Sequence, residues 1–136
     1  MSEPLLTEID HVAIAVKDLD AAIEYYRDTF GCEVTHREIV ERDGVEEALL
    51  KVADSYEQLL MPVSDASPVA KYLDKMGEGI HHVGYRVDDC AAALEHVKAQ
   101  GHQVIDNAPR PGSRGTTVAF VHPTTAYGTL IELVQE

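Results

Sequence analysis

The sequence predicts an α+β fold in which one β-α-β-β-β module occurs twice and the two modules pair. The first observation is an internal repeat, because residues 9–26 and 80–97 are identical at eight of eighteen positions without a gap. The second is a shared order of patterns: an alternating strand, an aspartate, an amphipathic helix, a glycine and further strands. We therefore expect two similar sheets, each covered by a helix.

Each predicted helix begins at an aspartate and ends at a glycine. Asp18 and Asp89 can accept the unpaired amide hydrogens of a first helical turn, and Gly31 and Gly101 can adopt the left-handed conformation that ends a helix. Apolar side chains at helical spacing follow each aspartate and are expected to pack on the sheets. They are Leu19, Ile23, Tyr26 and Phe30 in the first copy, and Cys90, Leu94 and Val97 in the second.

Three runs of strand-forming residues follow each helix. They are residues 32–40, 45–52 and 56–63 in the first copy, and 102–106, 116–122 and 128–135 in the second. A helix over 67–77 should link the copies, because Ser67 is a candidate N-cap and Pro68 and Gly77 suit its start and end. The predicted organisation is a single domain over residues 1–136, with module 1 at about 8–63 and module 2 at about 79–135.

Composition narrows the class of protein. A chain of 136 residues that is 45% hydrophobic suffices for one core, and a net charge of −13 argues against nucleic-acid binding. The amino-terminal residues resemble no secretion signal and no apolar run reaches the length of a membrane span, so a cytoplasmic location is expected. Cys32 and Cys90 are far apart and are expected to be free thiols.

Two histidines stand side by side in "GIHHVGYRV", and strand alternation separates their roles. In the first copy His11 shares a face with the small residue Ala13, while the alternate valines suit packing under a helix. By the repeat, His82 is the partner of His11 and lies beside Gly84, whereas His81 falls on the helix-facing side. We therefore expect His11 and His82 to bind a ligand and His81 to be structural.

The last strand of each copy adds an oxygen donor. Glu132 lies among apolar residues, where a carboxylate is costly unless it is paired or bound to a metal, and Gln58 takes the comparable place in the first copy. Two imidazoles, a carboxylate and an amide oxygen favour an octahedral divalent ion such as Co²⁺, Mn²⁺, Ni²⁺ or Mg²⁺ over structural zinc.

The chain resembles the vicinal oxygen chelate superfamily, and within it the methylmalonyl-CoA epimerases. The similarity rests on "IDHVAIAV", "SPVAKYL", "GIHHVGYRVDD" and "FVHPTTAYGTLIEL". It implies that the two modules form a cupped mixed sheet around a metal held by His11, Gln58, His82 and Glu132. Co²⁺ is the first candidate for this ion, and Mn²⁺, Ni²⁺ or Mg²⁺ are the alternatives. It also implies a homodimer that acts on a small-molecule acyl-CoA.

The resemblance further implies a reaction. The family interconverts (2R)- and (2S)-methylmalonyl-CoA by 1,1-proton transfer through a metal-stabilised enolate, with two bases on opposite sides of C2. Here these would be Glu132, which is also a ligand, and a glutamate of "DGVEEALLKV". Strand alternation favours Glu47, with Glu46 as the alternative.

The segment "RPGSRGTTVAFVHP" is the candidate contact with coenzyme A. Its Arg110, Ser113, Arg114 and Gly115 offer positive charge and backbone amides for phosphate on an otherwise acidic chain. The alternatives are a glyoxalase-like lyase or a thiol transferase on the same scaffold, and a metal-free drug-binding module. Ethylmalonyl-CoA is also an open possibility as a substrate.

Overall fold

The computed structural model describes residues 4–136, which divide into two compact units. One unit is His11–His81, and the other joins the amino-terminal residues up to Asp10 with His82–Glu136. The boundaries fall inside β1 (Glu8–Ala15) and β5 (Gly79–Arg86). Within residues 4–136, no helix has the length and apolar character that a membrane span requires.

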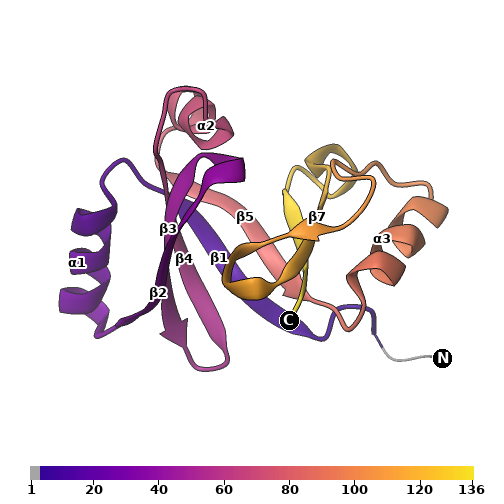
Figure 1. Ribbon diagram of the computed structural model, residues 1–136, viewed down its shortest axis with the longest axis horizontal. Coiled ribbons are helices and arrows are strands. Elements are labelled where there is room, and N and C mark those ends of the chain that lie inside the picture. Colours follow the sequence, from indigo (N-terminus) through magenta and orange to yellow (C-terminus); the bar gives the residue numbers. More distant parts are fainter. Residues whose placement is uncertain (1–3) are drawn as a thin grey trace. The chain divides into compact units, whose positions relative to one another are not determined.

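The first module contains the predicted strand-helix-strand order and one linking helix. After β1 come α1 (Leu19–Phe30), β2 (Val34–Val40), the short 3-10 helix Glu41–Asp43, β3 (Val45–Val52), β4 (Ser55–Pro62) and α2 (Pro68–Met76). The strand order is β2-β3-β4-β1, with β2, β3 and β4 antiparallel and β1 parallel to β4. This sheet and its α1 helix are seen in Figure 1.

The helix boundaries follow the predicted caps. The Asp18 carboxylate accepts a hydrogen bond from the Ala21 amide at 3.0 Å, and Gly31 ends α1 with a left-handed φ of 71°. The Ser67 hydroxyl likewise accepts from the Val69 amide at the start of α2. These side chains supply partners for backbone groups that a helix terminus leaves unpaired, which is why the sequence located both helices correctly.

The two helices of this module pack on opposite faces of its sheet. The α1 face is a cluster of buried apolar side chains, namely Val16, Leu19, Ala48, Leu50 and Leu59. The α2 face buries a second cluster, Ala13, Ala15, Val45, Leu60, Val69 and Leu73. One predicted member of the α1 stripe is wrong, because Phe30, at the last residue of the helix, is 61% exposed and its ring contacts the neighbouring Tyr25 and Tyr26.

The second module repeats the plan on a smaller scale. After β5 come α3 (Cys90–Ala99), β6 (Arg110–Pro111), the 3-10 helix Ser113–Gly115, β7 (Thr117–Val121), the 3-10 helix Pro123–Thr125 and β8 (Ile131–Gln135). The strand order is β5-β8-β7-β6, with β5 parallel to β8. Buried side chains of α3 and the sheet form one core, Val87, Cys90, Ala93, Leu94, Ala119, Val121 and Leu133. Cys32 and Cys90 are free thiols, as expected.

The predicted strand over 102–106 is wrong. That segment makes a single bridge, Val104 to Val121, and the short β6 lies later in the chain. The Asp106 carboxylate accepts the Phe120 amide hydrogen at 2.8 Å, so a side chain takes a donor that a continuing ladder would give to a backbone carbonyl. Pro109 and Pro111 also lack amide hydrogens, which limits pairing beyond this point.

Candidate metal-binding and catalytic site

His11 and Gln58 lie on the same face of the first sheet. In the parallel pairing of β1 with β4, Ala13 stands opposite Gln58, and His11 is two residues before Ala13. Side chains two apart on a strand share a face, so the imidazole and the carboxamide point to the same side. Both side chains are buried, and the fully buried Ala13 leaves only a methyl group beside the carboxamide.

The carboxamide of Gln58 is only half satisfied. Its Nε2 donates a hydrogen bond to Oε2 of Glu47, which is 1% exposed. Its Oε1 is buried and has no hydrogen-bond partner within residues 4–136. A buried amide oxygen without a hydrogen-bond partner lowers the stability of a folded protein. This atom is therefore a candidate ligand for a cation.

The two candidate bases in β3 point in opposite directions. Leu49 lies opposite Gln58 in the β3–β4 pairing, and Glu47, two residues earlier, therefore shares the face of Gln58. Glu46 points to the other face, where Arg37 donates to its carboxylate at 2.8 Å. Of the two, Glu47 is the buried carboxylate on the same sheet face as Gln58.

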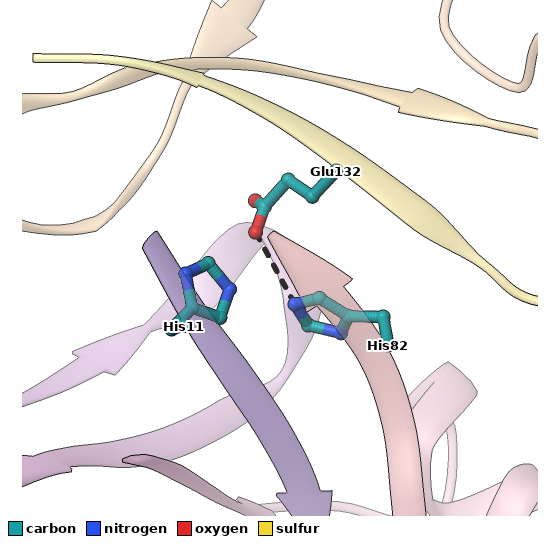
Figure 2. Close-up of side chains that lie close together, drawn as sticks. All are labelled: His11, His82 and Glu132. Atoms are coloured by element: carbon teal, nitrogen blue, oxygen red, sulfur yellow. Dashed lines mark hydrogen bonds and ion pairs between the residues drawn. The ribbon is translucent and has the colours of Figure 1, made fainter. Parts of the chain in front are cut away.

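His82 and Glu132 form a buried pair in the second sheet. Gly84 stands opposite Glu132 in the parallel pairing of β5 with β8, so His82 lies on the same face as the carboxylate. The His82 Nε2 and Glu132 Oε1 atoms are 3.2 Å apart, and a dashed line joins these two side chains in Figure 2. The neighbouring His81 instead packs edge-on against Tyr72, with ring centroids 4.9 Å apart. The opposed placement of the two histidines agrees with strand alternation.

The donor set fits a divalent cation. Figure 2 draws His11, His82 and Glu132, the group of side chains that could hold a metal ion. In the first unit Gln58 offers a buried oxygen without a hydrogen-bond partner in the described residues, and in the second unit His82 and Glu132 offer a nitrogen and an oxygen from buried positions. Mixed nitrogen and oxygen donors suit octahedral first-row ions and Mg²⁺, whereas structural zinc sites prefer thiolates.

Asp10 is buried between two arginines. Its carboxylate accepts from Arg86 Nε at 2.7 Å and from Arg114 Nη2 at 2.7 Å and 2.8 Å, and only 1% of the residue is exposed. Arg114 also lies 3.5 Å from Glu136 and has a left-handed φ of 44°. The guanidinium that the sequence offered to coenzyme A is thus bound to carboxylates of the chain itself.

The other members of the candidate coenzyme A loop are also held by local contacts. Arg110 Nε is 3.3 Å from an Asp106 carboxylate oxygen, and its guanidinium lies 5.3 Å from the centre of the Phe120 ring. The Ser113 carbonyl accepts from the amide and the hydroxyl of Thr116. Gly115 follows Arg114 with a φ of 76°, so two successive residues are left-handed.

Sequence reasoning passed over two residues of this region. Phe120 packs edge-on against the His82 ring at 5.3 Å, and it is opposite Glu132 in the β7–β8 pairing. The alternation of β7 places Phe120 on one face, and that signal could have found it. Asp10 had a weaker signal, namely a charged residue inside an otherwise apolar strand next to His11.

Comparison with known proteins identifies the family. Residues 10–120 match the glyoxalase/bleomycin resistance protein/dioxygenase superfamily. Over 133 residues, the chain is 38% identical to the ethylmalonyl-CoA/methylmalonyl-CoA epimerase of Cereibacter sphaeroides, covering 96% of this chain and 99% of that protein. The chain belongs to the methylmalonyl-CoA epimerase family. It is therefore an enzyme of the epimerase class, as the sequence predicted.

Solved structures of the methylmalonyl-CoA epimerase family share the fold. A variant of the Streptomyces coelicolor enzyme in complex with 2-nitronate-propionyl-CoA superposes with a TM-score of 0.93 at 44% identity, over 96% of this chain and 98% of that one. The Mycobacterium tuberculosis enzyme gives a TM-score of 0.94 at 41% identity, over 99% and 91% of the two chains. The prediction of a vicinal oxygen chelate fold is confirmed.

Proposed function

We propose that this chain interconverts (2R)- and (2S)-methylmalonyl-CoA by removing the proton at C2 and returning it from the opposite side. The observation that carries the proposal is that each unit holds one buried carboxylate in direct contact with a candidate metal ligand. Glu47 accepts from Gln58, and Glu132 lies against His82. We infer the substrate from the epimerase relatives, because they share 38–44% identity with this chain over nearly its full length.

We propose that His11, Gln58, His82 and Glu132 together hold one divalent cation, with Co²⁺ as the first candidate. The unpartnered Oε1 of Gln58 and the buried His82–Glu132 pair support this set. A bound cation would supply Lewis-acid stabilisation of the negative charge that develops beside C2. The superfamily is metal-dependent, although one related structure of methylmalonyl-CoA epimerase contains methylmalonyl-CoA and NH₄⁺.

The two carboxylates would divide the proton transfer. Glu47 is a fixed base, because its hydrogen bond from Gln58 holds one carboxylate oxygen and its burial excludes competing water. Glu132 is the base on the other side of C2, and His82 orients it. Each residue removes the proton of one epimer and donates a proton to form that epimer in the reverse direction.

The segment 110–115 is proposed as the contact with coenzyme A. Because Arg114 is engaged by Asp10 and Glu136, its contribution would be to hold the turn in place. Ser113 and Gly115 would then offer backbone groups to the acyl-CoA, with Arg110 at the edge. Retention of activity with a short pantetheine thioester, together with a raised KM, would measure what the rest of the coenzyme contributes.

We propose that the protein is a cytoplasmic homodimer, because its family resemblance implies this. Sedimentation equilibrium should give twice the chain mass of 14.9 kDa. A monomer at micromolar concentration would contradict the dimer and leave the proposed chemistry unaffected.

Proton exchange tests the reaction directly. Protein loaded with Co²⁺ is incubated with (2R)- or (2S)-methylmalonyl-CoA in D₂O, and deuterium at C2 is followed together with configuration. We expect inversion with solvent deuterium incorporated, and loss of both after treatment with EDTA. Absence of inversion and exchange with Co²⁺, Mn²⁺ and Ni²⁺ would reject this substrate. The search would then move to glyoxalase-like lyase or thiol-transfer reactions.

A further inference from the structure

Phe120 lies at the centre of a contact network beside the proposed base Glu132. Its ring meets the His82 ring nearly at right angles, with an interplanar angle of 84° and a centroid distance of 5.3 Å. It also stands opposite Glu132 in the antiparallel pairing of β7 with β8. Paired residues of antiparallel strands have Cβ atoms about 5 Å apart, so the ring and the carboxylate are immediate neighbours on one sheet face.

Two further side chains hold this ring. The Asp106 carboxylate accepts the Phe120 amide hydrogen at 2.8 Å through Oδ2, and its Oδ1 lies 3.3 Å from Arg110 Nε. Arg110 then places its guanidinium over the ring, 5.3 Å from the ring centre. A cation over an aromatic face is attracted to it, so Asp106 and Arg110 restrict the ring through its backbone and through its face.

The position of Phe120 matters because the reacting carbon must come close to Glu132. A base has to reach its proton within hydrogen-bond distance, which brings C2 and its alkyl substituent next to the carboxylate. Since Phe120 is the cross-strand neighbour of Glu132, its ring offers apolar surface beside that substituent. His82 and Glu132 are polar, so an apolar alkyl group would pack on Phe120.

We propose that Phe120 selects the substituent at C2 of the acyl group, favouring methyl over ethyl, and that Arg110 and Asp106 hold its ring for this purpose. The proposal rests on the proposed function and adds a residue that determines specificity. Arg110 thereby becomes a positioning residue for Phe120. A rigid ring limits the length of the substituent, and one methylene in an apolar pocket changes specificity by about 10- to 200-fold.

The experiment compares kcat/KM for methylmalonyl-CoA and ethylmalonyl-CoA in metal-loaded protein. In Phe120→Leu, the ethyl-to-methyl ratio should rise at least about tenfold over wild type, because the smaller side chain makes room for one methylene. Arg110→Gln should raise the same ratio by a smaller factor, since the ring remains but is held less firmly. Phe30→Leu is the matched control, because Phe30 is exposed at the end of α1, and its ratio should equal that of wild type.

Three outcomes separate the possibilities. A raised ratio in Phe120→Leu with normal Co²⁺ binding and circular dichroism supports the proposal. An unchanged ratio in a folded, active Phe120→Leu enzyme overturns it and leaves the proposed function intact. Should wild-type protein fail to act on either thioester, the proposed function and this inference both fail. Phe120→Met gives a second, more conservative substitution if the leucine variant does not fold.

Discussion

Gln58 donates its amide hydrogen to Glu47 and leaves its own buried oxygen without a hydrogen-bond partner in the described residues. This contact distinguishes the two ends of one carboxamide, which strand alternation alone could not do. The nitrogen end binds a carboxylate, and the oxygen end is the atom proposed to bind a cation. Gln58 is thus a proposed metal ligand that also contacts a proposed base. Substitutions at Gln58 should therefore affect both metal binding and proton transfer.

Gln58→Leu should weaken Co²⁺ binding by at least about tenfold, because an oxygen ligand is lost and the neighbouring carboxylate loses its donor. Isothermal titration calorimetry measures the affinity. Gln103→Leu is the matched control, since Gln103 is exposed and should leave binding unchanged. Equal affinity in wild type and Gln58→Leu would remove Gln58 from the ligand set.

Glu47→Gln should retain the metal and lose inversion, because an amide cannot accept the C2 proton. Deuterium exchange from one epimer should survive if Glu132 still acts on its side. Glu46→Gln, which alters only the pair with Arg37 on the other face, should remain within a few-fold of wild-type turnover. Wild-type inversion by Glu47→Gln would transfer the role to another residue.

His82→Ala should abolish both Co²⁺ binding and turnover, because it removes a proposed ligand and leaves Glu132 without its partner. His81→Ala should keep substantial activity, since His81 packs on Tyr72. The metal content of the two purified variants, measured by elemental analysis, decides the point. Equal loss of metal in both variants would contradict the assignment of strand faces.

Asp10→Asn should destabilise the protein by about 3 kcal/mol or more, because it removes the charge that compensates two arginines largely withdrawn from water. Urea unfolding followed by circular dichroism measures this free energy. Asp28→Asn is the control, since its pair with Arg27 is exposed and such pairs contribute about 0–1 kcal/mol. Similar unfolding midpoints for the two variants would show that the buried network contributes little.

Tyr26 should make the protein sensitive to alkaline pH. Burial, assisted by the charge and hydrogen bond of Glu57, raises the pKa of Tyr26 from 10.0 to about 12. Because the folded-state pKa lies above the unfolded value, the stabilising contribution is complete below pH 10 and is lost as the pH rises towards 12. Tyr26→Phe should lack this loss between pH 10 and 12, which thermal unfolding at several pH values would reveal.

Local sequence patterns predicted much of the fold, because the same patterns occur in both copies of the repeat and each copy supports the interpretation of the other. Alternation along "IDHVAIAV" and "GIHHVGYRV" separated His82 from His81, and the same rule favoured Glu47 over Glu46, whereas the face that Glu47 shares with Gln58 follows from the β3–β4 register. Side-chain caps located α1 and α2 to within a residue or two. These features depend on neighbours in sequence or in register, which a pattern records directly.

Features that depend on distant side chains could not be predicted in this way. The strand expected over 102–106 is interrupted because Asp106 binds the Phe120 amide, fourteen residues away. The role of Arg114 is set by Asp10, from the opposite end of the chain. Phe30 fits the helical spacing of an apolar stripe, yet at the last residue of α1 it is 61% exposed. Periodicity indicates a face and does not indicate what covers that face.

Asp10 and His81 hold the same place in the two copies of the repeat, each directly before a histidine proposed to bind metal. One has become the centre of an ion-pair network and the other an aromatic packing partner. A duplicated gene segment has therefore kept a histidine at one position of its first strand while the adjacent position has diverged. An ancestor with two identical copies would have had the same residue at both places, so the present asymmetry arose after the duplication.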